Sequence, residues 1–230
     1  MYKRQSLHIL LKKLCEIRGI RWIRILYCYP EEIYDELIET IRDEKKICHY
    51  LDIPIQHASD RILKRMGRRT SKQELIDIVG KLRKEIPDIV LRTTLITGFP
   101  GETEEDHEEL KEFVDEMEFD RLGVFTYSPE ENTPAAEMAD QVPEEVKEER
   151  RDELMELQQE ISYDRGQDRI GQELLVMIEG KVADESAYIG RTYGDAPKVD
   201  CYIFVQTGEL LMTGDFAKVR VTGALEYDLI

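Results

Sequence analysis

A strand-like segment that leads directly into a glycine turn and then into a helix constrains this chain most. Residues 91–103 read LRTTLITGFPGET, and the β-branched and apolar first half suits a buried strand. Gly98 and Gly101 lack Cβ atoms, so the backbone there can approach a ligand closely. A helix N-terminus adds unpaired N–H groups and the positive end of a dipole. The stretch predicts a βα unit whose turn is either an ordinary connection or a ligand cradle.

The same alternation of helix and strand extends over the first half of the chain. Strands are expected at residues 22–28, 50–56, 91–96 and 121–127, with amphipathic helical patterns before and between them. Pro54 argues against a central position for the second strand. Repeated alternation predicts a parallel sheet covered by helices. Ligands bind at the carboxyl ends of such strands, where four unusual loops would lie together, at residues 27–30, 56–59, 98–103 and 127–133.

Charge is distributed unevenly along this part of the chain. Between Arg61 and Lys72 there are six basic residues and no acid, whereas eleven carboxylates and one lysine occupy residues 102–120. The basic cluster is either a solvated helix face or an anion-facing patch near the mouth of a site. The acidic segment is expected to be the solvent-exposed surface of the helix that follows the glycine turn.

The overall composition bounds the function. A net charge of −17 disfavours a protein that holds nucleic acid by itself, and it suits a basic protein partner. A hydrophobic content of 41% supports a real core, and no apolar run is long enough to cross a membrane. Cys15, Cys28, Cys48 and Cys201 have no metal-ligand spacing, so no metal site is predicted. Isolated cysteines without a signal peptide suggest a cytoplasmic location.

Changes in the pattern of residue types divide the chain into three parts. Residues 1–142 hold the helix–strand alternation, and residues 143–165 form one long acidic helix that connects to the rest. In residues 166–230, short β-type runs separated by Gly, Asp and Pro suggest a small barrel. These runs are expected at residues 173–179, 187–192, 199–206 and 216–221. This last part contains six basic and eleven acidic residues.

Several segments together resemble the radical S-adenosylmethionine (SAM) methylthiotransferase family. They are LDIPIQHASDRILKRMGRR, LRTTLITGFPGETEEDHEELKEFV, RLGVFTYSPEENTPAAEM and GRTYGDAPKVD. QHAS at 56–59 and DAPKVD at 195–200 are similar to the RimO type, which modifies an aspartate of the small-subunit ribosomal protein S-twelve. The MiaB type, which modifies an adenosine of transfer RNA, usually has a QSGS-like sequence at the first position. The resemblance implies the second half of a partial radical SAM (TIM-like) barrel, followed by an OB-like TRAM domain.

The chain departs from that family in what it lacks. Family members carry an N-terminal domain with an auxiliary iron–sulfur cluster and a CxxxCxxC loop for the radical SAM 4Fe-4S cluster, and neither is present in this sequence. We therefore expect a C-terminal piece that is inactive alone. In an intact member, SAM and the clusters supply a radical, the sulfur and the methyl group, and the product is a methylthio group on the β-carbon of the aspartate. Two alternatives remain, a MiaB-type enzyme and a non-catalytic remnant that binds SAM or the ribosome.

The resemblance also implies which residues face the cofactor SAM. Backbone approach is expected at Gly98, Phe99 and Gly101, and polar groups facing the cavity are expected from Gln56 and Arg92. His57 and Tyr127 are further candidates, although a single histidine beside a strand end is more often a structural hydrogen-bonding group. No catalytic residue and no metal ligand is predicted. The acidic TRAM part is expected to bind the basic ribosomal protein, and its excess of acids disfavours transfer RNA.

Overall fold

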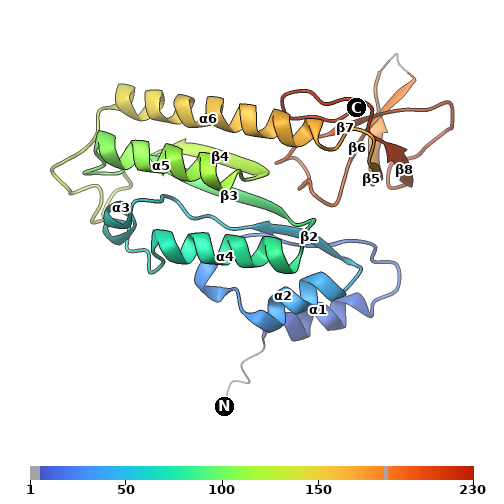
Figure 1. Cartoon of the computed structure of the whole chain (residues 1–230), viewed down its shortest axis with the longest axis horizontal. Coiled ribbons are helices and arrows are strands. Elements are labelled where there is room, and N and C mark those ends of the chain that lie inside the picture. The colour runs from blue at the N-terminus through green and yellow to red at the C-terminus, as the bar shows by residue number, and fades with distance from the viewer. Residues whose placement is uncertain (1–5, 184–185) are drawn as a thin grey trace. The chain divides into compact units, whose positions relative to one another are not determined.

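The computed structural model describes residues 6–183 and 186–230 (Figure 1). The chain forms two compact units, and the division between them falls within one long helix, between Gln158 and Gln159. The three-part division predicted from the sequence stays a prediction. In the described ranges, no helix has the combination of length and apolar character that crossing a membrane requires.

The first unit is a four-stranded parallel sheet in the order β1-β2-β3-β4, with helices between the strands. Figure 1 shows β2, β3 and β4 with α4 and α5 beside them. This confirms the topology expected from the alternation. Its elements are α1 (Leu7–Cys15), β1 (Ile23–Ile25), the 3-10 helix η1 (Pro30–Glu32), α2 (Asp35–Asp43), β2 (Ile47–Asp52), α3 (Asp60–Arg65), α4 (Lys72–Glu85), β3 (Val90–Thr97), α5 (Glu104–Met117), β4 (Arg121–Thr126) and the start of α6 (Glu144–Gln167).

The second strand lies earlier in the sequence than predicted. It was expected at residues 50–56, but β2 ends at Asp52 because Pro54 has no N–H to continue the ladder. The backbone nevertheless stays hydrogen-bonded to β3. The N–H of Gln56 donates to the carbonyl of Thr94 (2.9 Å), and the carbonyl of Gln56 accepts from Ile96 (2.8 Å). The loop after β2 is thus fixed against β3 at its carboxyl end.

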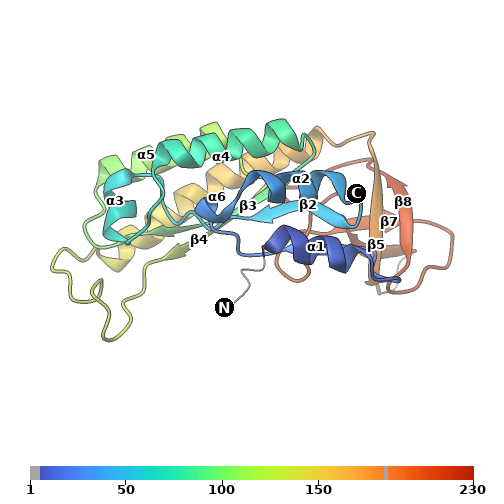
Figure 2. The same cartoon turned by 90° about the horizontal axis from the view of Figure 1, so that it is seen from below.

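The two faces of β3 differ in burial. Leu91 and Leu95 are fully buried, and Figure 2 shows α4 and α5 on one side of the strands. Arg92, Thr94 and Ile96 alternate with them on the opposite face and are only half-buried. On the neighbouring strand, Phe125 lies opposite Ile96 in the register and is 61% exposed. The sheet therefore has one covered face and one open face, and Arg92 lies on the open one.

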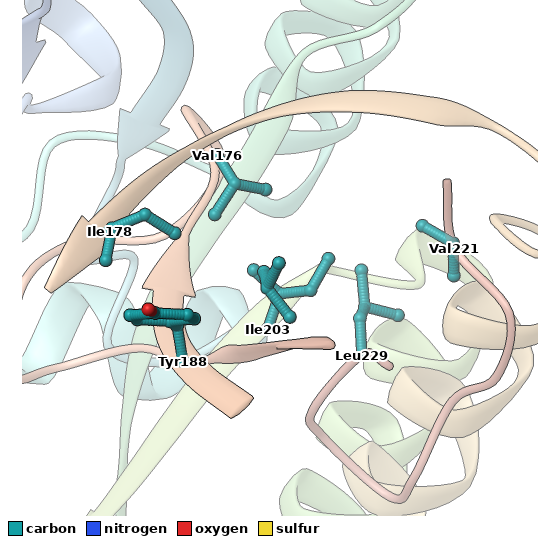
Figure 3. Close-up of a cluster of buried hydrophobic side chains, with 7 residues drawn as sticks. Val176, Ile178, Tyr188, Ile203, Val221 and Leu229 are labelled. Carbon is teal, nitrogen blue, oxygen red and sulfur yellow. The ribbon is translucent and has the colours of Figure 1, made fainter. Parts of the chain in front are cut away.

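The second unit is an antiparallel sheet in the order β7-β6-β5-β8. Its core includes Val176, Ile178, Ile203 and Leu229, whose side chains come from separate segments and point toward a shared interior (Figure 3). This arrangement is consistent with the OB-like barrel expected from the sequence. The strands are β5 (Glu173–Lys181), β6 (Ala187–Arg191), β7 (Ile203–Gln206) and β8 (Phe216–Arg220).

One predicted strand of this unit begins late. A strand was expected from residue 199, but β7 starts at Ile203. The preceding residues form a turn in which the N–H of Asp200 donates to the carbonyl of Ala196 (3.1 Å). The carboxylate of Asp200 in return accepts from the N–H of Ala196 (2.8 Å). A side chain that satisfies the local backbone competes with ladder formation, so the turn delays the strand.

Replacing Gly190 on β6 by alanine is expected to destabilise this sheet by about 1–3 kcal/mol, because the added methyl group overpacks the core. Its Cβ would lie 2.3 Å from Cγ1 of Val176 and 2.9 Å from the carbonyl oxygen of Met177. Gly180 on β5 is the matched control, since a Cβ there meets nothing within 4 Å. Chemical denaturation of the two variants should show a lower midpoint for Gly190→Ala only. Equal midpoints would contradict the packing of β6 against β5.

Candidate functional site

The loops that follow the four strands of the first unit gather at one edge of the sheet, as predicted. All three strand pairs are parallel, so every carboxyl end faces the same way. Gln56 follows β2, the glycine turn follows β3, and Tyr127 follows β4. Arg92 lies further back, on the open face of β3. The structure therefore brings the predicted loop residues to one edge.

The glycine turn is organised by Glu102, a residue that the sequence analysis placed among exposed acids. Its carboxylate accepts hydrogen bonds from the N–H groups of Gly98 (2.8 Å) and Phe99 (3.3 Å), and its side chain has no exposed surface. Arg150 of α6 donates to the other carboxylate oxygen at 2.9 Å. Burial raises the pKa of Glu102, but the contacts with His57, the Gly98 N–H and Arg150 outweigh burial and lower the pKa overall. The turn thus encloses an ionised carboxylate of its own chain.

His57 completes this arrangement and has no exposed surface. Its Nδ1 accepts from the backbone N–H groups of Ala58 (3.0 Å) and Ser59 (2.9 Å), so Nδ1 carries no proton. The remaining ring nitrogen, Nε2, lies 3.5 Å from the Glu102 carboxylate. These contacts favour a structural role that joins the loop after β2 to the glycine turn. A direct contact of His57 with a cofactor stays a prediction.

The space beside the two glycines is filled by side chains of this chain. A Cβ on Gly98 would lie 2.1 Å from Cγ of Lys147, and one on Gly101 would lie 2.5 Å from the Asp140 carboxylate. Gly98 and Gly101 have φ angles of +71° and +83°, which L side chains rarely adopt. Close packing against α6 and the loop before it therefore explains both glycines. Cofactor contact through these backbone positions remains a prediction.

Two buried basic residues of α6 hold the loop ends, and the sequence analysis missed both. Lys147 is 4% exposed and its ammonium donates to the carbonyl of Tyr127 (2.9 Å). Arg150 is 6% exposed and pairs with Glu102 and, at 3.1 Å, with Glu104. Lys147 and Arg150 are three residues apart and therefore lie on one face of the helix. Two basic residues on one face of an otherwise acidic helix were the signal in the sequence that could have predicted this contact.

The buried polar atoms at this edge that lack a hydrogen-bond partner within the described residues include Nε2 of His57 and Nε of Arg150, and two more that belong to predicted site residues and do not contact the Glu102 cluster. These two atoms are the amide oxygen Oε1 of Gln56 and the hydroxyl of Tyr127. Leaving such a group unsatisfied costs about 1–3 kcal/mol, so both atoms fit contacts with a polar ligand. Gln56 also has a φ of +72°, a strained conformation for a residue with a side chain and one that is typical of functional sites. The unpartnered atoms of Gln56 and Tyr127, together with the φ of Gln56, fit a cofactor at this edge of the sheet.

An apolar cluster lies next to these groups. The rings of Phe99 and Tyr127 pack edge to face with centroids 5.2 Å apart, and both contribute to a cluster with Ile62. Ile96 and Met138 pack against the same cluster. An apolar wall with a few unsatisfied polar atoms is the usual composition of a small-molecule site. The predicted residues Phe99 and Tyr127 thus share one wall.

Arg92 has a carboxylate neighbour on the next strand. Its Nε lies 3.8 Å from Oδ1 of Asp52, which it faces directly in the register of β2 and β3. Arg121 lies opposite Arg92 on the other side, on β4. Charged residues therefore form a row across the open face of the sheet, and this row is separate from the cluster around Glu102.

The basic cluster of residues 61–72 mostly braces the loops. Arg61 pairs with Asp106 and donates to the carbonyl of Gly101 (2.8 Å). Arg65 donates to the carbonyl of Pro100 (3.0 Å) and pairs with Asp140 (2.8 Å). Arg68 donates to the carbonyl of Pro54, and Lys72 pairs with Glu109. These four residues brace the loops, although Arg61 is itself exposed, as are Lys64 and Arg69. The two roles expected from the sequence stay predictions.

Asp106 shows the electrostatic result of this bracing. Burial raises the pKa of its carboxyl, but hydrogen bonds from Ser59, the Thr103 backbone and Arg61 outweigh burial and lower the pKa to about 2. The same carboxylate caps α5 by accepting from the N–H of Thr103 (2.8 Å).

Within residues 6–183 and 186–230, no cluster of three or more His, Cys, Asp or Glu side chains could hold a metal ion.

Comparisons with known proteins find a similarity for a part of each unit. The profile of the radical SAM superfamily matches residues 4–114, and that of the TRAM domain matches residues 170–230. The ribosomal protein uS12 methylthiotransferase RimO of Lachnoclostridium phytofermentans is 64% identical over all 230 residues of this chain, which cover 52% of that protein. The RimO of Clostridium botulinum strain Langeland is 52% identical, with the whole chain covering 51% of it. The chain thus spans about half the length of the curated relatives it matches.

A solved structure supports the fold. The radical SAM enzyme coproporphyrinogen III oxidase (HemN) of Escherichia coli aligns with 81% of this chain and 48% of its own, with a TM-score of 0.56. Its sequence is 17% identical, so the similarity concerns the fold alone.

Proposed function

We propose that the chain forms part of a RimO-type radical SAM methylthiotransferase, an enzyme that adds a methylthio group to ribosomal protein uS12. The acceptor is the β-carbon of an aspartate. The observation that carries the proposal is the 64% identity to a RimO over the entire chain. The unsatisfied polar atoms at the carboxyl edge of the sheet support a cofactor there.

The proposed cofactor is SAM, together with 4Fe-4S clusters held by residues outside this chain. When bound, these groups supply the radical chemistry, the sulfur and the methyl group. The chain's own task is to bind and orient SAM. Gln56 Oε1 accepts a hydrogen bond from a cofactor N–H, the Tyr127 hydroxyl provides a second polar contact, and Phe99 provides an apolar wall. Arg92, on the open face of β3, is a further polar residue that we assign to the cofactor.

The residues around Glu102 act on the cofactor indirectly. Gly98 and Gly101 allow α6 and the preceding loop to pack closely, and His57 joins two of the loops through Glu102. This packing fixes the backbone on which Gln56, Phe99 and Tyr127 are placed. Rigid support of this kind is what accurate cofactor orientation requires.

We assign uS12 docking to the TRAM part of the chain. With six basic and eleven acidic residues in 166–230, it suits a basic protein and disfavours an RNA backbone. A binding titration of the full chain with uS12 and with transfer RNA tests the assignment. We expect binding of uS12 that weakens as salt rises, because the attraction is screened. Salt-sensitive binding of transfer RNA in place of uS12 would favour the MiaB-type alternative.

The catalytic proposal is tested by exchanging segments. The matching half of the Lachnoclostridium phytofermentans relative is replaced by this chain, and the hybrid is reconstituted anaerobically with iron and sulfide. We expect the mass of uS12 to increase by one methylthio group, whereas the chain alone leaves uS12 unchanged. A hybrid that modifies transfer RNA adenosine, or that folds, binds clusters and modifies neither substrate, would overturn the proposal.

Replacing Gln56 by alanine in this hybrid is expected to weaken SAM binding about tenfold, the effect of one lost hydrogen bond. Gln73 on α4 is the matched control, because it is exposed and bonds only to Asp77 in the same helix. Calorimetric titration with SAM should separate the two variants. Equal dissociation constants for Gln56→Ala and the parent hybrid would show that this amide does not contact SAM.

A further inference from the structure

The second unit contains a cavity that the proposed reaction does not use. Within the described residues, β7 and β8 are the edge strands of the sheet and do not pair with each other. A cavity of about 430 Å³ lies between them, within the size range of ligand pockets. We call this cavity the seam. It is lined by Ile203, Phe204, Val205, Gln206, Thr207, Glu209, Leu211, Ala217, Lys218, Val219, Arg220, Thr222 and Ile230.

The backbone of β8 offers hydrogen-bonding groups to the seam. In an antiparallel ladder, successive residues direct their N–H and C=O groups to opposite sides. Val221 donates toward β5, whereas the next residue, Thr222, donates to the carbonyl of Ile230 (2.7 Å). The N–H groups of Arg220 and Lys218 follow the alternation of Thr222 and therefore face the seam.

The edge of β7 is arranged in the same way. The N–H of Phe204 points away from β6 and donates to the carbonyl of Leu229 (2.8 Å). Gln206, two residues further along, therefore directs its backbone groups to the same side. Both edges of the seam thus present backbone groups of the kind that an added strand pairs with.

The segment Leu229–Ile230 of this chain indicates the distance between the two edges of the seam. Leu229 hydrogen-bonds to β7 through Phe204, and the adjacent Ile230 hydrogen-bonds to the residue after β8 through Thr222. One extended segment therefore reaches both edges at this end. The two edges are one strand apart there, and the open part of the seam continues from that point.

Side chains along the seam specify the chemistry of an occupant. Val205 and Val219 belong to the apolar core or pack against it, so they line the inner side. Lys218 and Arg220 lie on the outer side, with side chains 77% and 67% exposed, and they share one carboxylate, that of Glu173. Cross-strand neighbours pair apolar with apolar and cation with anion. An occupant strand therefore alternates apolar residues inward with acidic residues outward.

We propose that the seam binds an extended peptide segment with alternating apolar and acidic residues, which adds a strand between β7 and β8. Main-chain hydrogen bonds supply the affinity and the alternation supplies the specificity, as in other cases of strand addition. An RNA strand lacks the N–H and C=O pattern that both edges require. This site is separate from the proposed methylthiotransferase site, so either proposal can fail without the other.

In the test, the capped peptide Val-Glu-Val-Glu-Val-Glu is titrated into the full chain, and NMR of the backbone amides monitors binding. We expect saturable binding that slows hydrogen exchange at Gln206, Lys218 and Arg220. The peptide Val-Lys-Val-Lys-Val-Lys should bind about three- to tenfold more weakly, the effect of losing two exposed ion pairs. Absence of saturation, slowed exchange at other strands, equal binding of the lysine peptide, or displacement by oligouridylate would each overturn the proposal.

Matched variants separate charge recognition from unfolding. In the double variant Lys218→Gln with Arg220→Gln, the preference for the glutamate peptide over the lysine peptide should be lost, because the outer cations are removed while the backbone edges remain. Lys181→Gln is the control, since Lys181 is exposed on β5 and does not line the seam. A preference for the glutamate peptide that survives the double variant, in a chain with an unchanged NMR fold pattern, would refute the assignment of specificity to these two residues.

Discussion

Replacing Glu102 by alanine is expected to lower the free energy of unfolding of the first unit by about 3–5 kcal/mol, the effect of removing one partner from a buried ion pair. The substitution leaves Arg150, which is 6% exposed, without its buried carboxylate. It also removes the acceptor for the N–H groups of Gly98 and Phe99. Denaturant unfolding followed by circular dichroism measures the change.

The control for this experiment is Glu104→Ala. Glu104 pairs with the same arginine, but its side chain is 68% exposed, so its removal is expected to cost less than about 1 kcal/mol. Glu102→Gln separates charge from hydrogen bonding, because the amide oxygen still accepts from the turn while the charge is lost. We expect the loss of unfolding free energy for Glu102→Gln to lie between the losses for Glu102→Ala and Glu104→Ala. A loss for Glu102→Ala as small as that for Glu104→Ala would contradict the central role of the Glu102 carboxylate.

Replacing Gly98 by alanine is expected to cost about 3–5 kcal/mol, from a positive φ and an overpacked contact together. The new methyl group would lie 2.1 Å from Cγ and 2.9 Å from Cβ of Lys147. Lys147 has little freedom to move, because it is buried and its ammonium bonds the carbonyl of Tyr127. The turn must therefore separate from α6 for the alanine to fit.

Gly67 provides a matched control for that substitution. Its φ of +73° is nearly the same as that of Gly98, but a Cβ there meets nothing within 4 Å. Gly67→Ala should therefore show only the backbone cost of about 1–2 kcal/mol. Thermal or denaturant unfolding of the two variants gives the difference. If both lose the same stability, the contact between the glycine turn and Lys147 is not tight.

The sequence was a good guide to the parallel sheet because alternating helices and strands leave few topologies. The strand pattern of residues 91–96 is a local signal, and β3 appears where it was expected. The strand expected at residues 50–56 ends at Asp52 because Pro54 has no N–H for the ladder, although Gln56 still hydrogen-bonds to β3. Such a boundary depends on the neighbouring strand and is not encoded locally.

The candidate site was only partly accessible from the sequence. The loops were placed correctly, but Glu102 was taken as one exposed acid among eleven, and Arg150 as part of an acidic surface. Their pairing joins residues 48 positions apart, and burial of a charged residue is a tertiary property that periodicity does not reveal. The same applies to the basic cluster, where Arg61 and Arg65 find partners on distant loops.

The anchoring of α6 on the glycine turn has a consequence for synthesis on the ribosome. The turn is translated 48 residues before Arg150, the cation that neutralises its buried carboxylate. At roughly 5–20 residues per second, this interval is about 2–10 s. During that time Glu102 lacks its partner Arg150, Gly98 lacks its packing against Lys147, and the carbonyl of Tyr127, once translated, lacks its donor Lys147. We therefore expect the nascent first unit to be a chaperone client until α6 has emerged.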